Sequence, residues 1–283
     1  MIGGKNDLPS SLRSFKNRMK LGIIAYFDQE KFCEEAFRSA KEKGLEFLEF
    51  CINDGDDVNA YISETPKLRT SLEKYDLEVG SVGRWGATRI LKDGSINSEE
   101  LETEKSIIRW CHDIGCKVYV TGCNYVDSLS LYENCTSAIR YFEALIAYGK
   151  ENGVQIAVYN CRWNNFVHSD PIWSIILGHL PDLFIKYDTS HSVYDNGDYL
   201  LETKKWGHRF AHVHIKGSLR IGGERYDDPP AGMDQINWGA FLSALYRAGY
   251  DGNLSIEPHS ETWKGELGEK GVNYTIRYMR NLM

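Results

Sequence analysis

Eight short apolar runs alternate with longer amphipathic segments from residue 20 to the C-terminus. The runs expected to be strands are residues 21–27, 45–52, 77–83, 116–122, 154–160, 183–191, 210–217 and 253–259. The segments between them carry apolar residues at helical spacing. An open doubly wound sheet is the alternative, but no glycine-rich dinucleotide or P-loop fingerprint follows any run. Eight evenly spaced strand–helix units without a linker therefore predict a closed parallel α/β barrel, a single (β/α)8 domain.

Residues that start and stop helices agree with this division. Asn97 with Glu100 three residues later resembles a capping box. Asp170 followed by Pro171 predicts an N-cap with proline at the first helical position. Glycine stands where three of the helices should end, at Gly44, Gly115 and Gly153. We therefore expect the helices to fill the intervals between the strands.

Length and composition limit the class of protein. The chain has 283 residues, and we expect the barrel at 20–283 and a tail or short covering helix at 1–19, starting after Ser10 or Ser11. The net charge of −7 disfavours nucleic acid. The first residues lack the apolar core of a secretory signal, and no apolar run reaches membrane-spanning length. Seven cysteines without a CxxC pair indicate reduced thiols and a cytoplasmic protein.

The run AHVHIKG at 211–217 places titratable groups at alternate positions. Successive side chains of a strand point to opposite faces. His212, His214 and Lys216 therefore share one face, and the valine and isoleucine between them share the other. We expect the polar face to point into the barrel.

Other strand ends carry similar groups. The four expected at the C-terminal ends of strands are Glu49, Asp188, His214 and Glu257. Lys186 lies one layer below Asp188, and His191 lies just beyond it. One buried histidine or aspartate often belongs to a satisfied hydrogen-bond network rather than to a binding site. Fold stability requires nothing polar at the top of a barrel, however, so four such ends together predict a functional site there.

The residue types at these ends suit a metal ion. Asp188, His214 and Glu257 are ligands of hard or borderline divalent cations such as Mn²⁺, Mg²⁺, Co²⁺ or Zn²⁺. The other nitrogen of His214 would then need an orienting partner, for which His212 is a candidate. For His212 and Lys216 the sequence leaves two interpretations, in which each side chain either lines the pocket or packs inside the barrel.

Four motifs connect these residues to a known family. They are YDTSH at 187–191, HVHIKG at 212–217, PAGMDQINW at 230–238 and IEPH at 256–259. In this order and spacing, the chain from residue 20 to 283 resembles the xylose isomerase-like TIM barrel superfamily of sugar phosphate isomerases and epimerases. The resemblance implies one metal ion held by Glu, Asp, His and Glu from strands five to eight. Asp188, His214 and Glu257 match the last three.

The resemblance also implies substrate contacts. His191 and Arg220 match a histidine and an arginine that contact the substrate in the family, and Glu49 lies where strand two ends in a glutamate facing the pocket. Lys186 and Trp163 are further expected contacts, Trp163 as one of several strand-end aromatic residues that could stack on a sugar ring. The expected partner is a small-molecule sugar or polyol, with no nucleic acid and no membrane, and a homo-oligomer is compatible with it.

One position departs from the family pattern. Where strand five should end in a glutamate, which is both a metal ligand and a catalytic carboxylate in the epimerases, this chain has Tyr159, followed by Asn160. A phenol with an ordinary pKa near 10 is a poor ligand for Mg²⁺ or Mn²⁺ at neutral pH. Tyr159 could donate a hydrogen bond or a proton to the substrate, or it could plug the pocket. We therefore expect weak metal affinity.

Three functions are compatible with these residues. The first is an isomerase or epimerase acting on a ketose or related polyol through an enediolate, with Glu257 moving the proton and a divalent metal polarising the carbonyl. The second is an inosose-type dehydratase, a lyase that needs one base and one acid, for which Glu257 and Tyr159 would serve. The third is a non-catalytic sugar-binding barrel. The presence of Tyr159 in place of the glutamate favours the second and third functions more than before and the first one less, but the isomerase or epimerase remains the first choice.

Overall fold

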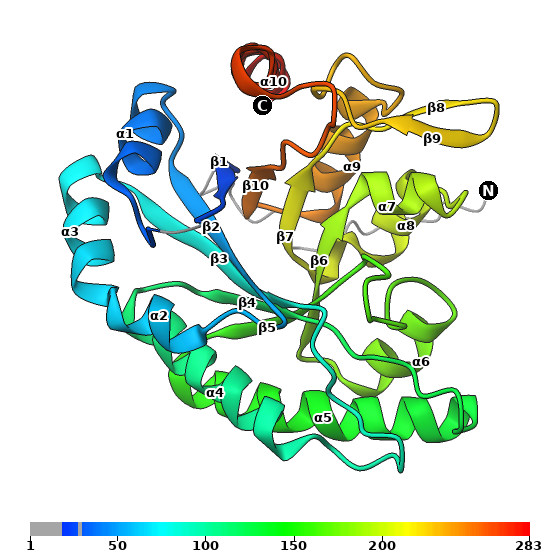
Figure 1. The fold of residues 1–283 in the computed structure, drawn as a ribbon. Coiled ribbons are helices and arrows are strands. Elements are labelled where there is room, and N and C mark those ends of the chain that lie inside the picture. The colour runs from blue at the N-terminus through cyan, green and yellow to red at the C-terminus, as the bar shows by residue number, and fades with distance from the viewer. Residues whose placement is uncertain (1–18, 28–29) are drawn as a thin grey trace, which may run out of the picture.

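The computed structural model describes residues 19–27 and 30–283 and confirms the predicted (β/α)8 barrel. The strands pair in parallel and close in the order β1-β10-β7-β6-β5-β4-β3-β2, which excludes the open doubly wound sheet (Figure 1). Their bounds are β1 Lys20–Ala25, β2 Phe47–Asn53, β3 Glu78–Trp85, β4 Val118–Thr121, β5 Gln155–Tyr159, β6 Leu183–Asp188, β7 Phe210–Ile215 and β10 Asn253–Ile256. The predicted N-terminal tail, apart from Met19, lies outside the described residues.

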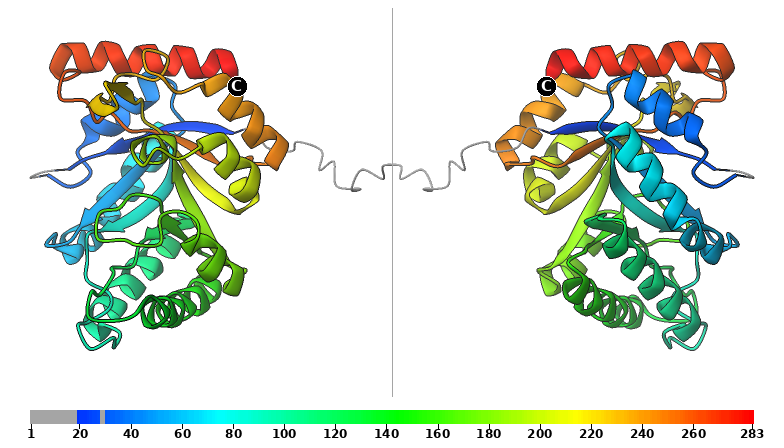
Figure 2. Two further views of the ribbon diagram at one scale, coloured as in Figure 1. Left: turned by 90° about the vertical axis from the view of Figure 1, so that its right-hand side faces the viewer. Right: turned by 90° about the vertical axis from the view of Figure 1, so that its left-hand side faces the viewer.

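Helices surround the barrel wall. They are α1 Glu34–Glu42, α2 Val58–Ser63, α3 Thr65–Tyr75, α4 Ser98–Asp113, α5 Leu131–Asn152, α6 Ile172–His179, α7 Thr189–Tyr194, α8 Tyr199–Trp206, α9 Trp238–Ala248 and α10 Gly265–Leu282, with a 3₁₀ turn at Gly207–Arg209. In both views of Figure 2, α10 lies near α1 and α9, and Arg280 donates a hydrogen bond to the carbonyl of Lys43 at 3.1 Å. The last helix is therefore bonded to the end of the first one. In the part of the chain that is described, none of the helices is long and apolar enough to cross a membrane.

The helix ends match most of the predicted signals. The Asn97 side chain accepts a hydrogen bond from the Glu100 backbone, and the three predicted glycines have positive φ. The Glu100 side chain, however, pairs with Arg84 instead of completing a capping box. The start of α6 was predicted one residue early: the helix begins at Ile172, and Pro171 is the N-cap residue. The Asp170 carboxylate still accepts from the Ser174 backbone.

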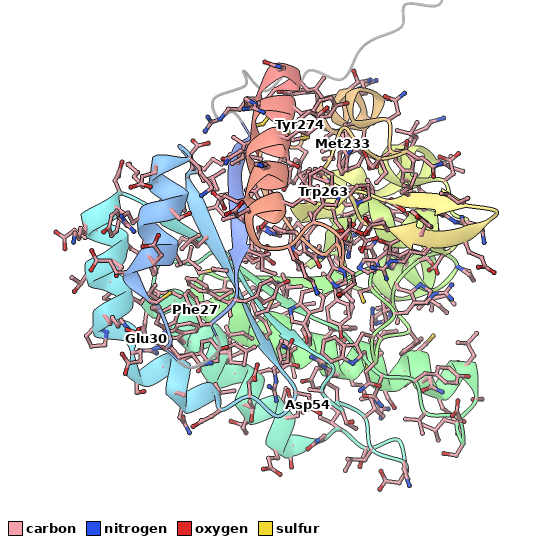
Figure 3. All side chains as sticks on the ribbon, turned by 45° about the horizontal axis from the view of Figure 1, so that its top comes forward. Phe27, Glu30, Asp54, Met233, Trp263 and Tyr274 are labelled. Atoms are coloured by element: carbon pink, nitrogen blue, oxygen red, sulfur yellow. The ribbon has the colours of Figure 1, made fainter. Side chains whose placement is uncertain are left out.

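Two elements had no clear sequence signal. Helix α7 follows β6 directly, and an antiparallel hairpin, β8 Leu219–Ile221 with β9 Glu224–Asp227, follows β7. The PAGMDQINW motif fastens this region, because Asp234 accepts hydrogen bonds from the backbone of Ser218 and from the Trp238 indole. Tyr274 lies on α10, and Met233 and Trp263 lie beside this helix (Figure 3). The motif therefore has a structural part in this chain.

The inside of the barrel is divided into an apolar part and a polar part. Trp85, Val118, Val120, Ala157 and Tyr159 form a separate buried cluster on β3, β4 and β5. The strands β2, β6 and β7 add buried acidic and basic residues to the interior, namely Glu49, Lys186, Asp188, His212 and His214. Because apolar packing already fills one side, the polar chemistry of the barrel is confined to the other.

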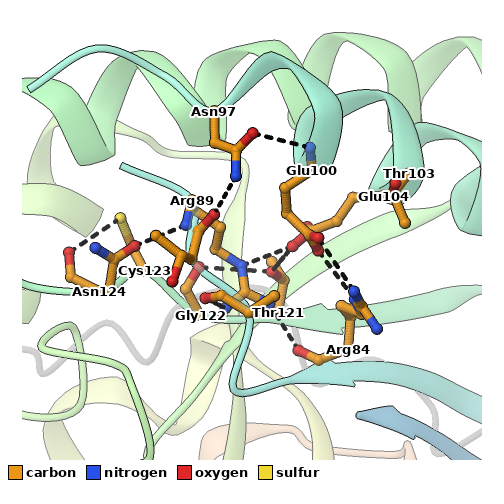
Figure 4. A network of polar contacts seen from close by, with 12 residues as sticks. Arg84, Arg89, Asn97, Glu100, Thr103, Glu104, Thr121, Gly122, Cys123 and Asn124 are labelled. Atoms are coloured by element: carbon orange, nitrogen blue, oxygen red, sulfur yellow. Dashed lines mark hydrogen bonds and ion pairs between the residues drawn. The ribbon is translucent and has the colours of Figure 1, made fainter. Parts of the chain in front are cut away.

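Two arginine–glutamate pairs fasten α4 to the barrel on the apolar side (Figure 4). Arg89 donates to Glu104 at 2.6 Å, and the Thr121 hydroxyl donates to the same carboxylate at 2.8 Å. Arg84 donates to Glu100 at 2.9 Å. Arg89 and Glu104 are both fully buried. Each charge therefore depends on its partner, since an unpaired buried charge is strongly unfavourable.

The same region holds three loops together. The Asn124 side chain after β4 accepts from the Arg89 backbone at 2.7 Å. Asn164 after β5 donates to the carbonyl of Gly86 at 2.9 Å. The loops after β3, β4 and β5 are thus fixed to one another around the Tyr159 side of the barrel.

We expect Arg89→Ala to lower the free energy of unfolding by about 3–5 kcal/mol, because it leaves Glu104 buried without its partner. Urea denaturation followed by circular dichroism measures this loss. The control is Lys150→Ala, which breaks an exposed pair with Asp182 and should change stability little. A loss no larger than that of the control would contradict the structural part given to the buried pair.

Candidate active site

A histidine between two carboxylates forms the centre of the polar side. His214 Nε2 lies 2.8 Å from Glu49 Oε2, and His214 Nδ1 lies 2.6 Å from Glu257 Oε2. His212 Nε2 donates to the same Glu49 carboxylate at 2.9 Å. All are buried except Glu257, whose side chain is 11% exposed. Because both ring nitrogens of His214 face carboxylate oxygens, both carry a proton and the ring is an imidazolium.

The charges of this centre support one another. Burial opposes ionisation of Glu49, but attraction to His214 and His212 and their hydrogen bonds hold the pKa of Glu49 well below its ordinary 4.5. Burial likewise opposes charge on His214, yet Glu49 raises the pKa of His214 above 6.5. Burial lowers the pKa of His212 despite Glu49, and its Nδ1 has no hydrogen-bond partner among the described residues. His212 is therefore the neutral member of the pair.

Register and strand alternation explain why these groups meet. His214 of β7 lies opposite Asp188 of β6 and Ser255 of β10, so Glu257, two residues beyond Ser255, follows on the same side. The sequence predicted Glu49 at the C-terminal end of its strand, and this placement was wrong. It is the third residue of β2, inside the barrel. It therefore reaches both the His212 and the His214 layers.

A second group surrounds the Lys216 ammonium. Its Nζ lies 3.0 Å from Asp188 Oδ2, 3.4 Å from Glu257 Oε1 and 3.3 Å from His191 Nε2. The Lys216 side chain is 3% exposed and Asp188 is fully buried. Burial opposes the charge of Asp188, but Lys216 outweighs it and lowers the pKa of Asp188. Burial, reinforced by Lys216, lowers the pKa of His191 to about 3, so this imidazole is neutral.

The YDTSH motif has a local geometric basis. Asp188 ends β6 and is also the N-cap of α7, since its Oδ1 accepts from the Ser190 backbone at 2.8 Å. One helical turn later, His191 returns to 3.5 Å from Asp188 Oδ2. Asn160 forms two hydrogen bonds with the Asp188 backbone, at 2.8 and 2.9 Å. Asn160 was not among the predicted site residues, although its place directly after Tyr159 was a signal for it.

Tyr159 lies on the apolar side of the barrel. Its ring stacks on Trp85 with centroids 4.2 Å apart, and its hydroxyl donates to the Trp163 carbonyl at 2.9 Å. Burial raises its pKa to about 12, so the phenol stays protonated. It forms no hydrogen bond with Asp188, His214 or Glu257. The strand-five position thus contributes an apolar wall instead of a carboxylate.

The three remaining predicted contacts have different surroundings. Lys186 is almost fully buried, and its ammonium lies 5.1 Å from the centre of the Trp85 ring. Among the described residues it forms no hydrogen bond or ion pair. Trp163 is 53% exposed and so presents its ring to solvent. Arg220 lies on the β8–β9 hairpin and donates to the Val193 carbonyl and the Asn196 side chain, so no contact joins it to the histidine centre.

Two sets of side chains offer ligand atoms within 4.8 Å of one another, namely Asp188, His214 and Glu257, and Glu49, His212 and His214. The first set is the one predicted from the sequence. As arranged, it does not fit a divalent cation. Both nitrogens of His214 are engaged by carboxylates, the Lys216 ammonium contacts both Asp188 and Glu257, and Tyr159 replaces the fourth, anionic ligand.

Glu49→Gln should lower the free energy of unfolding at pH 7 by about 3 kcal/mol or more, because it removes a buried charge shared by two imidazoles. The folded pKa of Glu49 is depressed, so its stabilisation is complete above pH 4.5 and is lost as pH falls through the folded pKa. The difference between wild type and variant should therefore shrink in acid. Urea denaturation at several pH values measures it, with the exposed Glu78→Gln as control. A pH-independent difference would contradict the charge assignment.

Comparison with known proteins identifies the family. A family model described as the xylose isomerase-like TIM barrel matches residues 37–282. The comparison with curated proteins gives no match. Similar solved structures include D-allulose 3-epimerase from Methylomonas sp. (TM-score 0.71, 17% identity, 94% of this chain and 99% of that one). Others are 3-keto-D-glucoside 4-epimerase from E. coli (0.73, 15%, 93% and 100%) and mannonate dehydratase from Streptococcus suis serotype 2 (0.75, 13%, 94% and 94%). At these identities the structures show a shared fold, and the match of the family model shows that the chain belongs to the xylose isomerase-like TIM barrel family.

Proposed function

We propose that this chain is an enzyme that removes a proton from a carbon next to a carbonyl group of a ketose or related polyol. The observation that carries the proposal is the state of Glu257. It follows the last strand, is partly exposed and is held by His214 and Lys216. Burial opposes its charge, but Lys216 and then His214 keep its pKa well below 4.5. Glu257 is therefore ionised and held at a fixed place, so it is able to accept a proton, and its basicity would rise if His214 or Lys216 turned from it to the substrate.

Other residues suit the charge that develops during proton removal. The substrate oxygen becomes negative as the enediolate forms, and a fixed cation nearby stabilises it. Lys186 has this property, because its ammonium is buried without an ion-pair partner among the described residues. We assign His191 to a substrate hydroxyl and the exposed Trp163 to the apolar face of the sugar. Arg220 would reach the substrate only by leaving its bonds to the Val193 and Asn196 loop.

The names of the similar solved structures support the choice of substrate class. Two of them are named as sugar 3- and 4-epimerases and a third as a dehydratase of mannonate. A divalent metal was expected beside Asp188, His214 and Glu257, but because the present arrangement does not fit one, the proposed proton transfer uses only side chains. The seven cysteines are free thiols, which agrees with our proposal that the enzyme acts in the reducing cytoplasm.

A dehydratase is the second candidate. Inversion of a carbon by two opposed carboxylates needs a base on each face of the substrate. Strand five ends in Tyr159, whose hydroxyl donates a hydrogen bond to the Trp163 carbonyl. Strand five therefore supplies no carboxylate opposite Glu257. One base is sufficient for isomerisation on a single face. It also suffices for loss of a β-hydroxyl when the proton that Glu257 removes from carbon is passed to the leaving hydroxyl, which departs as water. The Tyr159 position therefore favours these outcomes over epimerisation.

Proton removal can be measured directly. Incubation with D-allulose, L-ribulose, a 3-keto-glucoside and D-mannonate in D₂O should give exchange of a C–H for a C–D next to the carbonyl, or loss of water, with at least one of them. Nuclear magnetic resonance and mass spectrometry detect either product. Glu257→Gln should slow the reaction by about 10²-fold or more, while the exposed Glu261→Gln serves as control. No exchange and no dehydration in any member of the series, with sugar binding retained, would support the non-catalytic barrel instead.

Tyr159→Phe distinguishes a wall from a proton donor. The variant keeps the stack on Trp85 and loses one hydrogen bond to Trp163, so stability should fall by about 1 kcal/mol. We expect the exchange rate with the best substrate to stay unchanged, because the hydroxyl is committed to that carbonyl. A decrease of about 10²-fold would instead show that Tyr159 donates a proton, the catalytic part that its place in the sequence suggested.

A further inference from the structure

The Lys216 ammonium holds the position at which two of the three predicted metal ligands meet. It is 3.0 Å from Asp188 Oδ2 and 3.4 Å from Glu257 Oε1. Asp188 ends β6 and Glu257 follows β10. One oxygen of each carboxylate is held elsewhere, Asp188 Oδ1 by the Ser190 backbone and Glu257 Oε2 by His214, and the other oxygen of each faces the ammonium. A cation at that point explains why both turn towards it, since two buried carboxylates would otherwise repel each other.

The third predicted ligand is also committed. His214 donates one N–H to Glu49 and the other to Glu257, so it offers no free nitrogen lone pair. The anions of the connected cluster are Glu49, Asp188 and Glu257, and its cations are His214 and Lys216, with the Lys186 ammonium close by. The carboxylates are thus neutralised by side chains alone, without an added ion.

We propose that Lys216 replaces the divalent metal ion in this chain, so that a lysine ammonium holds the strand-end carboxylates together and the site binds no transition metal. The Tyr159 position agrees with this. A monovalent ammonium requires fewer anionic partners than a divalent ion, and strand five supplies no carboxylate to the cluster. The inference rests on the proposed function only for its chemical consequence, which is that proton transfer at Glu257 proceeds in the presence of a chelator.

Two matched variants separate the effect of the position of the Lys216 ammonium on metal binding from the effect of losing a positive charge. Lys216→Met removes the buried lysine directly after β7, and Lys186→Met removes the buried lysine in β6. Only the Lys216 ammonium contacts Asp188 and Glu257. Each full-length protein is stripped with EDTA, dialysed and titrated with Mn²⁺. Calorimetry gives the affinity, and thermal unfolding gives the shift in Tm that ligand binding produces by mass action.

We expect wild type and Lys186→Met to give no binding heat and no rise in Tm with Mn²⁺. Lys216→Met should unfold at a lower temperature without metal, regain stability with Mn²⁺, and bind the ion at least about tenfold more tightly than the other two proteins. If Lys216→Met does not fold, Lys216→Gln takes its place, because it keeps a hydrogen-bond donor without the charge.

Three results would overturn the proposal. The first is tight Mn²⁺ binding by wild type, which needs no variant. The second is equal gain of binding in Lys186→Met, which would show a general effect of charge rather than of position. The third is a folded Lys216 variant that does not bind Mn²⁺, which would show that the three side chains cannot hold a metal even without the ammonium. Each readout is independent of catalysis, so failure to find a substrate leaves the test intact.

Discussion

The bond between His214 and its two carboxylates determines the electrostatics of the whole barrel mouth. Glu49, His214, Glu257, Lys216 and Asp188 form a continuous series in which negative and positive groups alternate. In a buried setting each charge persists only because its neighbours have the opposite sign. The low pKa of the carboxylates and the raised pKa of His214 are therefore consequences of the same arrangement. Loss of one member would change the protonation of the others.

The apolar side of the barrel makes this series possible by confining it. Trp85 and Tyr159, the last residues of β3 and β5, stack on each other inside the barrel. The loops that follow these strands are fixed by Asn124, Asn164 and the buried Arg89–Glu104 pair. Lys186 lies between the two sides, with its ammonium over the face of Trp85. A cation that lies against a ring instead of a carboxylate does not spend its hydrogen-bond donors on the protein. The division into two sides thus separates Lys216, which binds anions of the protein, from Lys186, to which the proposed function assigns a substrate oxygen.

The sequence predicted the barrel and its inward-facing groups because both depend on periodicity. Alternation along 212–216 placed His212, His214 and Lys216 on one face, and the structure confirms that face as interior. The partner of each group could not be predicted, since it depends on register between strands far apart in the chain. Glu49 meets the histidines through the closed barrel, and the Arg89–Glu104 pair forms between a loop and the buried face of α4. Neither relation has a local sequence signal, and both groups could as well have been exposed.

Lys216 shows why residue type alone did not decide the chemistry. The sequence left Lys216 open between pocket and packing, and it ranked Asp188, His214 and Glu257 as metal ligands because their side chains are suitable donors. The same donors are equally suitable partners for an ammonium, which binds carboxylates with looser geometric demands than a metal ion. What differs is the number of anions available at one point, and here strand five ends in Tyr159 rather than in a carboxylate. The absence of that anion and the presence of the lysine act in the same direction, because each lowers the attraction of the site for a second positive charge. Tyr159 at the end of strand five and Lys216 directly after strand seven are therefore best interpreted together, as two features of one arrangement that neutralises the site.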